Sequence, residues 1–370
     1  MMNTWYRIHN AETLDTPALV IYPERVKSNL SVLRSFAEDL QRVRPHIKTN
    51  KCPQVARLMM EAGIGKFKCA TISEAEMLAM EGAKDVLLAY QPVGPKARRF
   101  CELQQKYPKT TFACLIDNLT TVKKLSVLSR EFAHSIRVFA DINIGMNRTG
   151  ISPGADAISL CAEAAETSGI VFVGLHAYDG HLHVADFAER KRKCDEGFRP
   201  VEDMREQLSR SLAREIIVVA GGTPTFPVHA KRNGVESSPG TFIFWDNGYH
   251  KLLSEQAFEF AALVVTRVIS TPDEYTVCVD LGHKSIASEN PLQKRVYFLN
   301  ATGLEPIGHS EEHLVLRSVA KHSYVPGDLF YGVPHHICPT VALYDEACIC
   351  QDNAVNETWP IVSRKRKISI

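Results

Sequence analysis

The chain has 370 residues, of which 45% are apolar and 23% are charged, a mixture that excludes a disordered chain, a collagen-like repeat and a coiled-coil rod. Its 43 basic and 42 acidic side chains nearly cancel, so net charge gives no reason to expect nucleic acid or an anionic membrane as a partner. No apolar run reaches 18 residues and the first residues lack a signal-peptide core, which predicts a soluble cytoplasmic protein.

Short apolar runs alternate with segments of helical spacing over the first two thirds of the chain. Strands are expected at 17–22, 43–48, 66–71, 85–90, 111–117, 135–142, 170–178 and 215–222. The segment 25–40 has a helical apolar face, Ser73 with Glu76 resembles a capping box, and Gly82 suits a helix end. Eight such repeats predict an α/β fold, a (β/α)8 TIM-like barrel over residues 1–257. An open doubly wound sheet is the alternative, but no GxGxxG motif follows the first strand.

From residue 258 the pattern changes to strands separated by turns, which predicts a C-terminal all-β domain over 258–370. Its last residues, SRKRKISI, form a charge run that we expect to be a solvated end. The ten cysteines are scattered without a disulfide framework, so reduced thiols are expected. Cys69, Cys114 and Cys278 lie in apolar runs and are predicted core residues.

The predicted second strand carries a lysine in a position suited to chemistry. Side chains alternate along a strand, so Arg44, His46 and Lys48 share one face, and Lys48 stands at the strand end, where barrel enzymes place their active sites. Such a cluster is costly to bury unless it is paired or functional. A partly desolvated lysine among other cations has a lowered pKa, which favours Schiff-base chemistry; a lysine that reaches solvent is the ordinary alternative.

Two glycine-containing turns follow late strands, at 220–226 and 237–246. Such turns leave backbone N–H groups free to surround a phosphate, and late strands are the usual phosphate position in barrels. Lys48 together with a phosphate site suggests pyridoxal 5′-phosphate.

A third constellation lies in VPHHICPTV, 333–341, where His336 and Cys338 stand two residues apart. An imidazole and a thiolate on the same side of an extended segment suit a borderline-soft divalent metal, and His335 could replace His336. Two protein ligands leave metal positions open for substrate or water.

These residues carry a resemblance to a known family. RPHIKTNK, DINIGMNRTGI, GLHAYDGH, AGGTPT, SPGTFIFWD, VDLGHKSIASE, SEEH and VPHHICPTV follow one another in this order across nearly the whole chain. The set resembles the D-threonine aldolase / D-serine dehydratase family, which comprises fold-type III pyridoxal-phosphate enzymes with a barrel of the alanine racemase N-terminal type.

The resemblance implies roles for individual residues. Lys48 would hold the cofactor as a Schiff base, with His46 in the same motif. Arg148 and Tyr178 would lie beside the cofactor ring, and the phosphate would be held by the loops of Gly222, Thr223, Gly240 and Thr241. His336 and Cys338 would bind the metal, so the β domain would contribute the metal site. The protein would be a homodimer. His181 and His183 are candidate bases, and His181 is our choice.

The chain departs from the family pattern at three positions, because Asn50 stands where histidine is frequent, His176 where glutamine is, and Trp245 where tyrosine is. The substrate side chain is therefore not transferred from the family.

The implied activity is that of a lyase that acts on β-hydroxy-D-amino acids. A cysteine ligand suits zinc better than magnesium or manganese, and in the family it accompanies dehydratases. We therefore rank dehydration (the D-serine or D-threo-3-hydroxyaspartate dehydratase type) before aldol cleavage (the D-threonine aldolase type). A racemase, which needs no such metal pair, and a non-catalytic cofactor carrier, which lacks a β domain, are rival interpretations.

Overall fold

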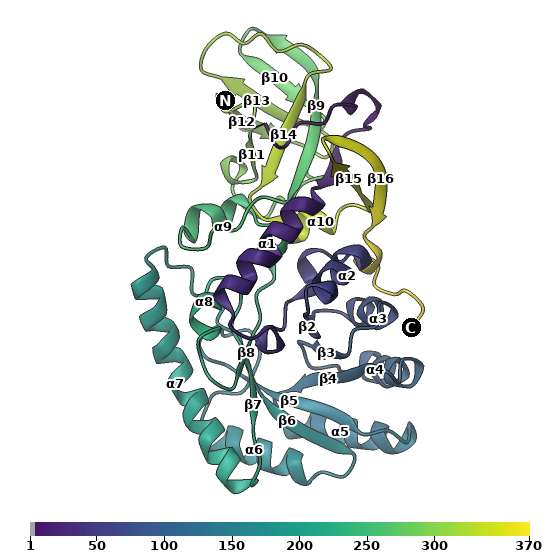
Figure 1. Cartoon of the computed structure of the whole chain (residues 1–370), viewed down its shortest axis with the longest axis vertical. Coiled ribbons are helices and arrows are strands. Elements are labelled where there is room, and N and C mark those ends of the chain that lie inside the picture. Colours follow the sequence, from purple (N-terminus) through teal and green to yellow (C-terminus); the bar gives the residue numbers. More distant parts are fainter. Residues whose placement is uncertain (1–3) are drawn as a thin grey trace. The chain divides into compact units, whose positions relative to one another are not determined.

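The computed structural model describes residues 4–370, which divide into two units (Figure 1). The first unit comprises 1–32, 49–55 and 241–364, and the second comprises 33–48, 56–240 and 365–370. The predicted division into a barrel domain over 1–257 and a β domain over 258–370 stays a prediction. None of the helices described in residues 4–370 has the length and apolar character needed to span a bilayer.

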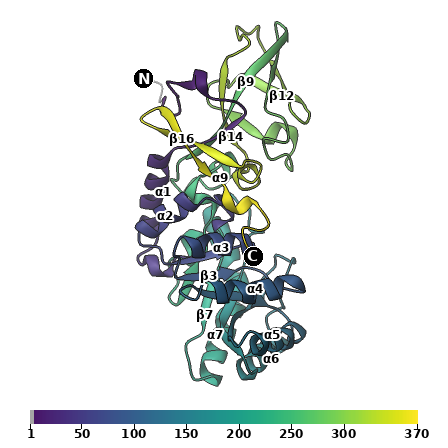
Figure 2. The same cartoon turned by 90° about the vertical axis from the view of Figure 1, so that its right-hand side faces the viewer.

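A parallel sheet forms the centre of the second unit, with strand order β2-β3-β4-β5-β6-β7-β8 among the described residues. Helices α3 to α6 lie along the outside of this curved sheet (Figure 2), and α7 packs against β6. The strands are β2 Lys66–Cys69, β3 Asp85–Leu88, β4 Thr111–Ile116, β5 Ile136–Ile142, β6 Ile170–Ala177, β7 Ile217–Ala220 and β8 Val235–Ser237. The helices are α3 Ile72–Met80, α4 Pro95–Lys106, α5 Leu119–Glu131, α6 Ala155–Glu166, α7 Phe187–Ser211 and α8 Phe226–His229.

Residues 43–46 close the curved sheet, which confirms the expected barrel class. Val43 forms a bridge with Ser237 of β8, and His46 forms one with Lys68 of β2. Arg44 N–H donates to the Ser237 carbonyl at 2.8 Å. The predicted strand 43–48 is therefore present only as isolated bridges, and Ile47–Thr49 form a 3-10 turn that carries Lys48.

An apolar cluster fills the inside of the barrel: Leu87, Ala113, Leu115, Phe139, Val173 and Val219. Arg44 is also buried, and its charge is compensated by Glu236 at 2.7 Å and Asp85 at 2.6 Å. The expectation that a buried cation on this segment needs a partner is thus confirmed for Arg44.

Of the predicted local features, the helix cap at Ser73 is wrong and the solvated C-terminal end is confirmed only in part. Ser73 is not the helix cap, because Thr71 accepts the N–H of Glu74 at 3.0 Å and α3 begins one residue before Ser73. The charge run is solvated as expected at Lys365, Arg366 and Lys367, which are exposed. The last two residues are nevertheless bound, because the buried Glu76 carboxylate accepts the N–H groups of Ser369 at 3.1 Å and Ile370 at 3.3 Å. Gly82, with φ +84°, ends α3 as predicted.

The first unit contains a mainly antiparallel sheet, in which β1 pairs with β9 and β15. The predicted first barrel strand, 17–22, is therefore part of this sheet, and the barrel strand β8 takes the remaining place. The strands are β1 Ala18–Ile21, β9 Ala262–Asp273, β10 Thr276–Val279, β11 Val296–Phe298, β12 Leu304–His309, β13 Leu314–Ser318, β14 Leu329–Pro334, β15 Glu346–Gln351 and β16 Ala354–Pro360. The helices are α9 Asn247–Leu252 and α10 Ile337–Val341, while α1 Pro23–Phe36 and α2 Pro53–Glu61 contribute residues to both units.

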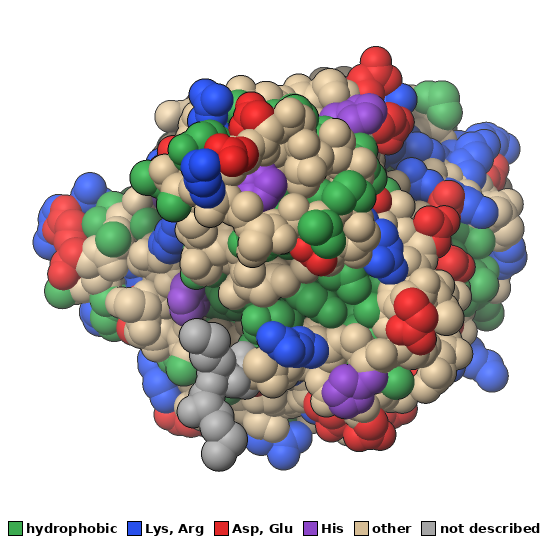
Figure 3. All heavy atoms as spheres, turned by 90° about the horizontal axis from the view of Figure 1, so that it is seen from above, with side chains coloured by type: hydrophobic (Ala, Val, Ile, Leu, Met, Phe, Trp, Pro, Cys, Tyr) green, Lys and Arg blue, Asp and Glu red, His purple; other side chains and the backbone are tan. Residues whose placement is uncertain are grey.

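Thiols and surface charge agree with the composition. The ten cysteines are free among the described residues; Cys69 and Cys114 are fully buried, whereas Cys278 is only partly buried. On the face displayed in Figure 3, basic and acidic side chains are interspersed, as expected from the near-zero net charge.

Candidate functional site

Lys48 and Tyr178 come together in the second unit at the ends of the barrel strands. Lys48 Nζ lies 6.0 Å from the centroid of the Tyr178 ring, which follows β6 directly. Lys48 is half-buried, and its backbone N–H donates to Nδ1 of the buried His46 at 3.2 Å. The structure therefore groups three of the residues that the sequence singled out.

Arg148 and His181 lie in loops of the same unit. The Arg148 guanidinium is 5.1 Å from the Tyr178 ring centroid, so this exposed cation covers the aromatic ring. His181 is exposed and lies against Gly145, where a Cβ would come within 2.9 Å of its Nε2. Gly145 belongs to the same GMNRTG loop as Arg148.

A buried amine that was not among the predicted site residues, that of Lys68, lies near the same ring. Lys68 Nζ is 5.6 Å from the Tyr178 centroid and 3.5 Å from Nε2 of His176, whose Nδ1 lies 2.7 Å from Asp141. Burial, and then the nearby Lys48, lower the pKa of Lys68 to about 7. Alternation along the expected strand 66–71 could have placed Lys68 inside the barrel, since Phe67 and Cys69 alternate with it.

The pH dependence of stability reports on this amine. The Lys68 pKa is about 7 in the folded chain against 10.5 for an unperturbed lysine, so between these pH values the unfolded chain binds a proton that the folded chain lacks. The destabilisation of the folded chain by the buried Lys68 amine is therefore fully present below pH 7, and it disappears as the pH rises towards 10.5. Lys68→Met should therefore stabilise the protein most at pH 7 and below, and its advantage should shrink by about 1.4 kcal/mol per pH unit above it.

Urea unfolding of the cofactor-free protein at pH 6.5, 8 and 9.5 measures this difference. Lys109→Met, at an exposed position of the same unit, is the matched control and should give a pH-independent difference. A constant difference for Lys68→Met as well would show that Lys68 is not a desolvated amine.

The two glycine-containing turns meet in the second unit. Gly240 N–H donates to Thr223 Oγ1 at 3.1 Å, and Ser238 N–H donates to the Ala220 carbonyl at 3.1 Å. Gly222 lies against the Tyr178 ring, where a Cβ would meet Cε2 at 3.0 Å. The phosphate loops that the sequence predicted are thus neighbours, next to the aromatic ring.

The polar and aromatic groups of these residues match the phosphate, the aldehyde and the ring of pyridoxal phosphate. The Ser238 hydroxyl is buried without a hydrogen-bond partner, beside turns whose glycines allow close approach, and a phosphate oxygen would satisfy it. Lys48 supplies an amine for the aldehyde, and Tyr178 supplies a flat apolar face for the ring.

His336 and Cys338 lie in the first unit at the start of α10. The two side chains are hydrogen-bonded; burial lowers the pKa of His336, but Cys338 and Glu289 outweigh it and raise this pKa to about 9. His336 Nδ1 lies 2.6 Å from Glu289, and Cys338 Sγ lies 3.1 Å from Thr49 Oγ1. The predicted donor pair is therefore in contact.

Further groups of the first unit surround this pair. Thr241, predicted to hold phosphate, has its Oγ1 3.7 Å from Cys338 Sγ. Burial raises the pKa of Asp246 to about 6, while backbone N–H groups, including that of Ile337 at 3.2 Å, act against this rise. An imidazole, a thiol and nearby carboxylates form a donor set that fits zinc. His335, the alternative ligand, has a buried Nδ1 without a partner.

The three departures from the family pattern lie in both units. His176 belongs to the Lys68 cluster, whereas Asn50 and Trp245 are fully buried residues of the first unit. Asn50 Nδ2 and Trp245 Nε1 are buried without hydrogen-bond partners.

A second group of possible metal ligands lies buried in the second unit. Asp179, Cys194 and His229 place one oxygen, sulfur and nitrogen atom each within 4.8 Å of one another. The sequence analysis missed this group because its members are distant in the chain.

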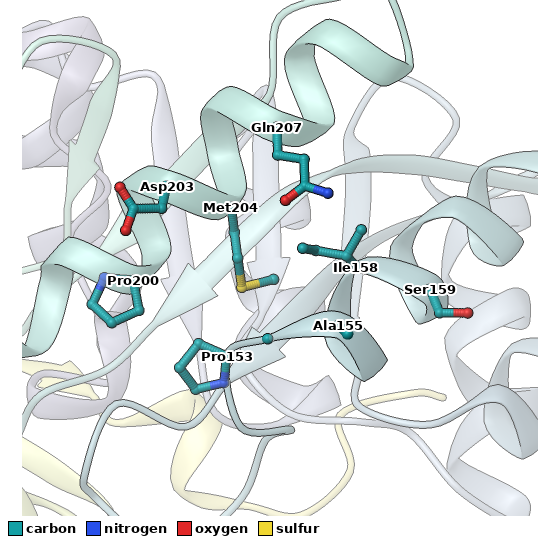
Figure 4. Close-up of a pocket in the computed structure, with 9 residues that line it drawn as sticks. Pro153, Ala155, Ile158, Ser159, Pro200, Asp203, Met204 and Gln207 are labelled. Carbon is teal, nitrogen blue, oxygen red and sulfur yellow. The ribbon is translucent and has the colours of Figure 1, made fainter.

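A surface hollow between α6 and α7 contrasts with these clusters (Figure 4). It is lined by Pro153, Gly154, Ala155, Ile158, Ser159, Pro200, Asp203, Met204 and Gln207. Asp203 is the one ionisable side chain among these lining residues, so the hollow lacks the groups needed for catalysis.

Comparisons with known proteins agree with this arrangement. Residues 21–247 match the family model "Alanine racemase, N-terminal domain", and residues 261–350 match "Putative serine dehydratase domain". The chain is 28% identical to D-threonine aldolase of Arthrobacter sp., over 95% of this chain and 93% of that protein. It is 26% identical to D-threo-3-hydroxyaspartate dehydratase of Delftia sp. (strain HT23), over 94% and 97%. The crystal structure of D-threonine aldolase from Filomicrobium marinum superposes with a TM-score of 0.88 at 28% identity, covering 95% of this chain and 96% of that chain.

Proposed function

Because the chain belongs to the family defined by the N-terminal domain of alanine racemase, with the type III fold of pyridoxal-phosphate enzymes, we propose that it is a pyridoxal-phosphate- and metal-dependent lyase for β-hydroxy-D-amino acids. The contact between His336 and Cys338 carries this proposal, since neither a racemase nor a cofactor carrier needs such a donor pair. Relatives named as aldolases and as a dehydratase support the lyase class.

The chain's own residues account for cofactor binding. Pyridoxal phosphate, when bound, supplies an electron sink for the electrons released at the α-carbon of an amino acid. Lys48 would hold its aldehyde carbon, the turns of Gly222 and Gly240 its phosphate, and Tyr178 its ring. Arg148, above Tyr178, would place positive charge near the ring. Lys48 Nζ can also carry a proton to or from the substrate α-carbon.

The donor pair accounts for the preference for a β-hydroxyl. A divalent metal, when bound, supplies a Lewis acid for that oxygen. His336 and Cys338 would hold the ion. His181, as a base, would accept a proton from the hydroxyl in aldol cleavage, which breaks the Cα–Cβ bond and gives glycine and an aldehyde. If a proton is removed from Cα instead, the hydroxyl leaves with a proton as water, and hydrolysis of the resulting unsaturated amino acid by a water molecule gives a keto acid and ammonia.

Between these outcomes we rank dehydration first, because a thiolate ligand favours zinc over the oxygen-preferring metals. Aldol cleavage is the second candidate, supported by the relatives named as aldolases. We also propose that the enzyme acts as a cytoplasmic homodimer.

A substrate panel tests the function and decides between the outcomes. D-serine, D-threonine and D-threo-3-hydroxyaspartate are each offered with zinc and pyridoxal phosphate, with the L-enantiomers as matched controls. We expect ammonia and keto acid from at least one D-isomer and at least tenfold less from its L-isomer. Aldehyde with glycine would reverse the ranking, and no product from any D-isomer would contradict the proposed lyase.

A further inference from the structure

Asp179 is a buried carboxylate on which three side chains of the second unit converge. It directly follows Tyr178, and its Oδ1 accepts the Thr225 hydroxyl at 2.7 Å. Its Oδ2 lies 2.9 Å from His229 Nε2 and 3.6 Å from Cys194 Sγ. Burial raises the pKa of Asp179, but these hydrogen bonds, foremost that of His229, outweigh it and lower the pKa, so the carboxylate is charged at neutral pH.

The same residues hold the turn that contains Gly222. Thr225 Oγ1, while donating to Asp179, accepts the Gly222 N–H at 3.3 Å. Gly221 has φ +75°, and a Cβ there would meet His229 Cδ2 at 2.5 Å and Thr225 Oγ1 at 2.9 Å. Asp179 therefore connects the chain segment after Tyr178 to the turn at 221–225 through two side chains.

The contacts indicate that Asp179, Cys194, Thr225 and His229 form a hydrogen-bonded cluster, here called the hub, rather than a metal site. A metal-bound histidine normally donates its second ring N–H to a partner, whereas His229 Nδ1 is buried and has no hydrogen-bond partner within residues 4–370. A proton on Nε2 of His229 accounts for this arrangement, because that N–H then donates to Asp179. Burial raises the pKa of Cys194, which keeps its thiol protonated and able to donate as well.

We propose that Asp179 is a positioning residue for the cofactor site: with Thr225 and His229 it fixes the Gly222 turn against the Tyr178 ring and thereby sets the affinity for pyridoxal phosphate. This inference rests on the proposed function, because it takes the Gly222 turn as the phosphate-binding turn.

Cofactor affinity, measured apart from turnover, tests the proposal. Pyridoxal phosphate is titrated into cofactor-free protein, and its dissociation constant is read from cofactor absorbance for the wild type, Asp179→Asn, Thr225→Val and Thr225→Ser. We expect the dissociation constant to rise at least tenfold for Asp179→Asn and Thr225→Val, and to stay within threefold for Thr225→Ser, which keeps the hydroxyl. Turnover at saturating cofactor should change less than affinity.

A matched control separates positioning from general destabilisation. Glu74 is another fully buried carboxylate of this unit, which accepts the Ala70 N–H at 2.6 Å, and Glu74→Gln should lower Tm without raising the cofactor dissociation constant. Wild-type affinity in Asp179→Asn, or an equal loss of affinity in Glu74→Gln, would overturn the proposal.

Metal analysis provides an independent check. Zinc is measured in a His336→Ala/Cys338→Ala variant and in the same variant with His229→Gln added. If the first variant retains one equivalent of zinc and the second loses it, the hub is a metal site, and its assignment as a hydrogen-bonded cluster is overturned. Zinc-free protein from the double variant supports the assignment. If the wild type itself bound no pyridoxal phosphate, the proposed function would fail, whereas a wild-type dissociation constant in Asp179→Asn would remove only this inference.

Discussion

Lys48→Ala abolishes the absorbance band of protein-bound pyridoxal phosphate and lowers turnover by about three orders of magnitude or more; this is the largest effect that we expect. The reason is chemical, since the amine at the end of the barrel-closing segment is the group that can condense with the cofactor aldehyde and carry the α-proton. Lys48 Nζ lies near Tyr178, so the loss removes the group at the centre of the predicted site. Spectrophotometry of the purified variant with added cofactor measures the band.

Two controls make this result specific. Lys109→Ala, at an exposed position, should keep both the band and the turnover. Lys68→Met should keep the band, because Lys68 is a second amine near the same ring and the proposal assigns the covalent role to Lys48. A band that survives in Lys48→Ala but disappears in Lys68→Met would transfer the covalent role to Lys68.

Cys338→Ala distinguishes the contribution of the metal from that of the cofactor, and it has the second largest expected effect. We expect turnover to fall at least a hundredfold and bound zinc to decrease, because the thiolate is the donor that fits this metal best. The cofactor band should persist, since Lys48 and the glycine-containing turns are unchanged. Metal analysis, the absorbance spectrum and the product assay on one preparation give the three readouts.

Chelation of the wild type should reproduce the Cys338→Ala result, and added zinc should restore turnover only in the chelated wild type. Cys348→Ala, a partly buried cysteine on β15 of the same unit, is the matched control and should keep its zinc and turnover. Full turnover in metal-free protein would exclude any catalytic role for the His336–Cys338 pair.

The barrel could be predicted because its strands alternate regularly with amphipathic helices. The run 17–22 was assigned to the wrong sheet, since a fully buried apolar strand has the same appearance in either sheet; β1 pairs with β9 and β15 instead. The strand β8, Val235–Ser237, was missed because three residues give no periodicity. The contacts of Ser369 and Ile370 could not be predicted, because their partner, Glu76, is almost 300 positions away in sequence.

The grouping of candidate residues could be predicted where these residues stand close together in sequence. Lys48, the two turns and the His336–Cys338 pair stand in short motifs, and the structure places the members of each motif together. For Lys68, only the alternation along the expected strand 66–71 indicates a side chain inside the barrel, and nothing in the local sequence distinguishes Asp179 from an ordinary polar residue. Their significance comes from burial and from partners on other strands and helices, which one sequence does not display.

The closure of the barrel at residues 43–46 has a consequence for how the enzyme acquires its cofactor. Each strand pair from β2 to β8 is joined over three or more residues, whereas this segment is joined to each neighbour by an isolated bridge, and Lys48 lies two residues after it. Transient detachment of residues 43–46 would displace the Lys48 amine, which is proposed to hold the cofactor. A cofactor bonded to that amine and held by the two turns would oppose the detachment. Cofactor binding and closure of the barrel at residues 43–46 are therefore linked equilibria. The vitamin derivative would stabilise the closed barrel in addition to its chemical role.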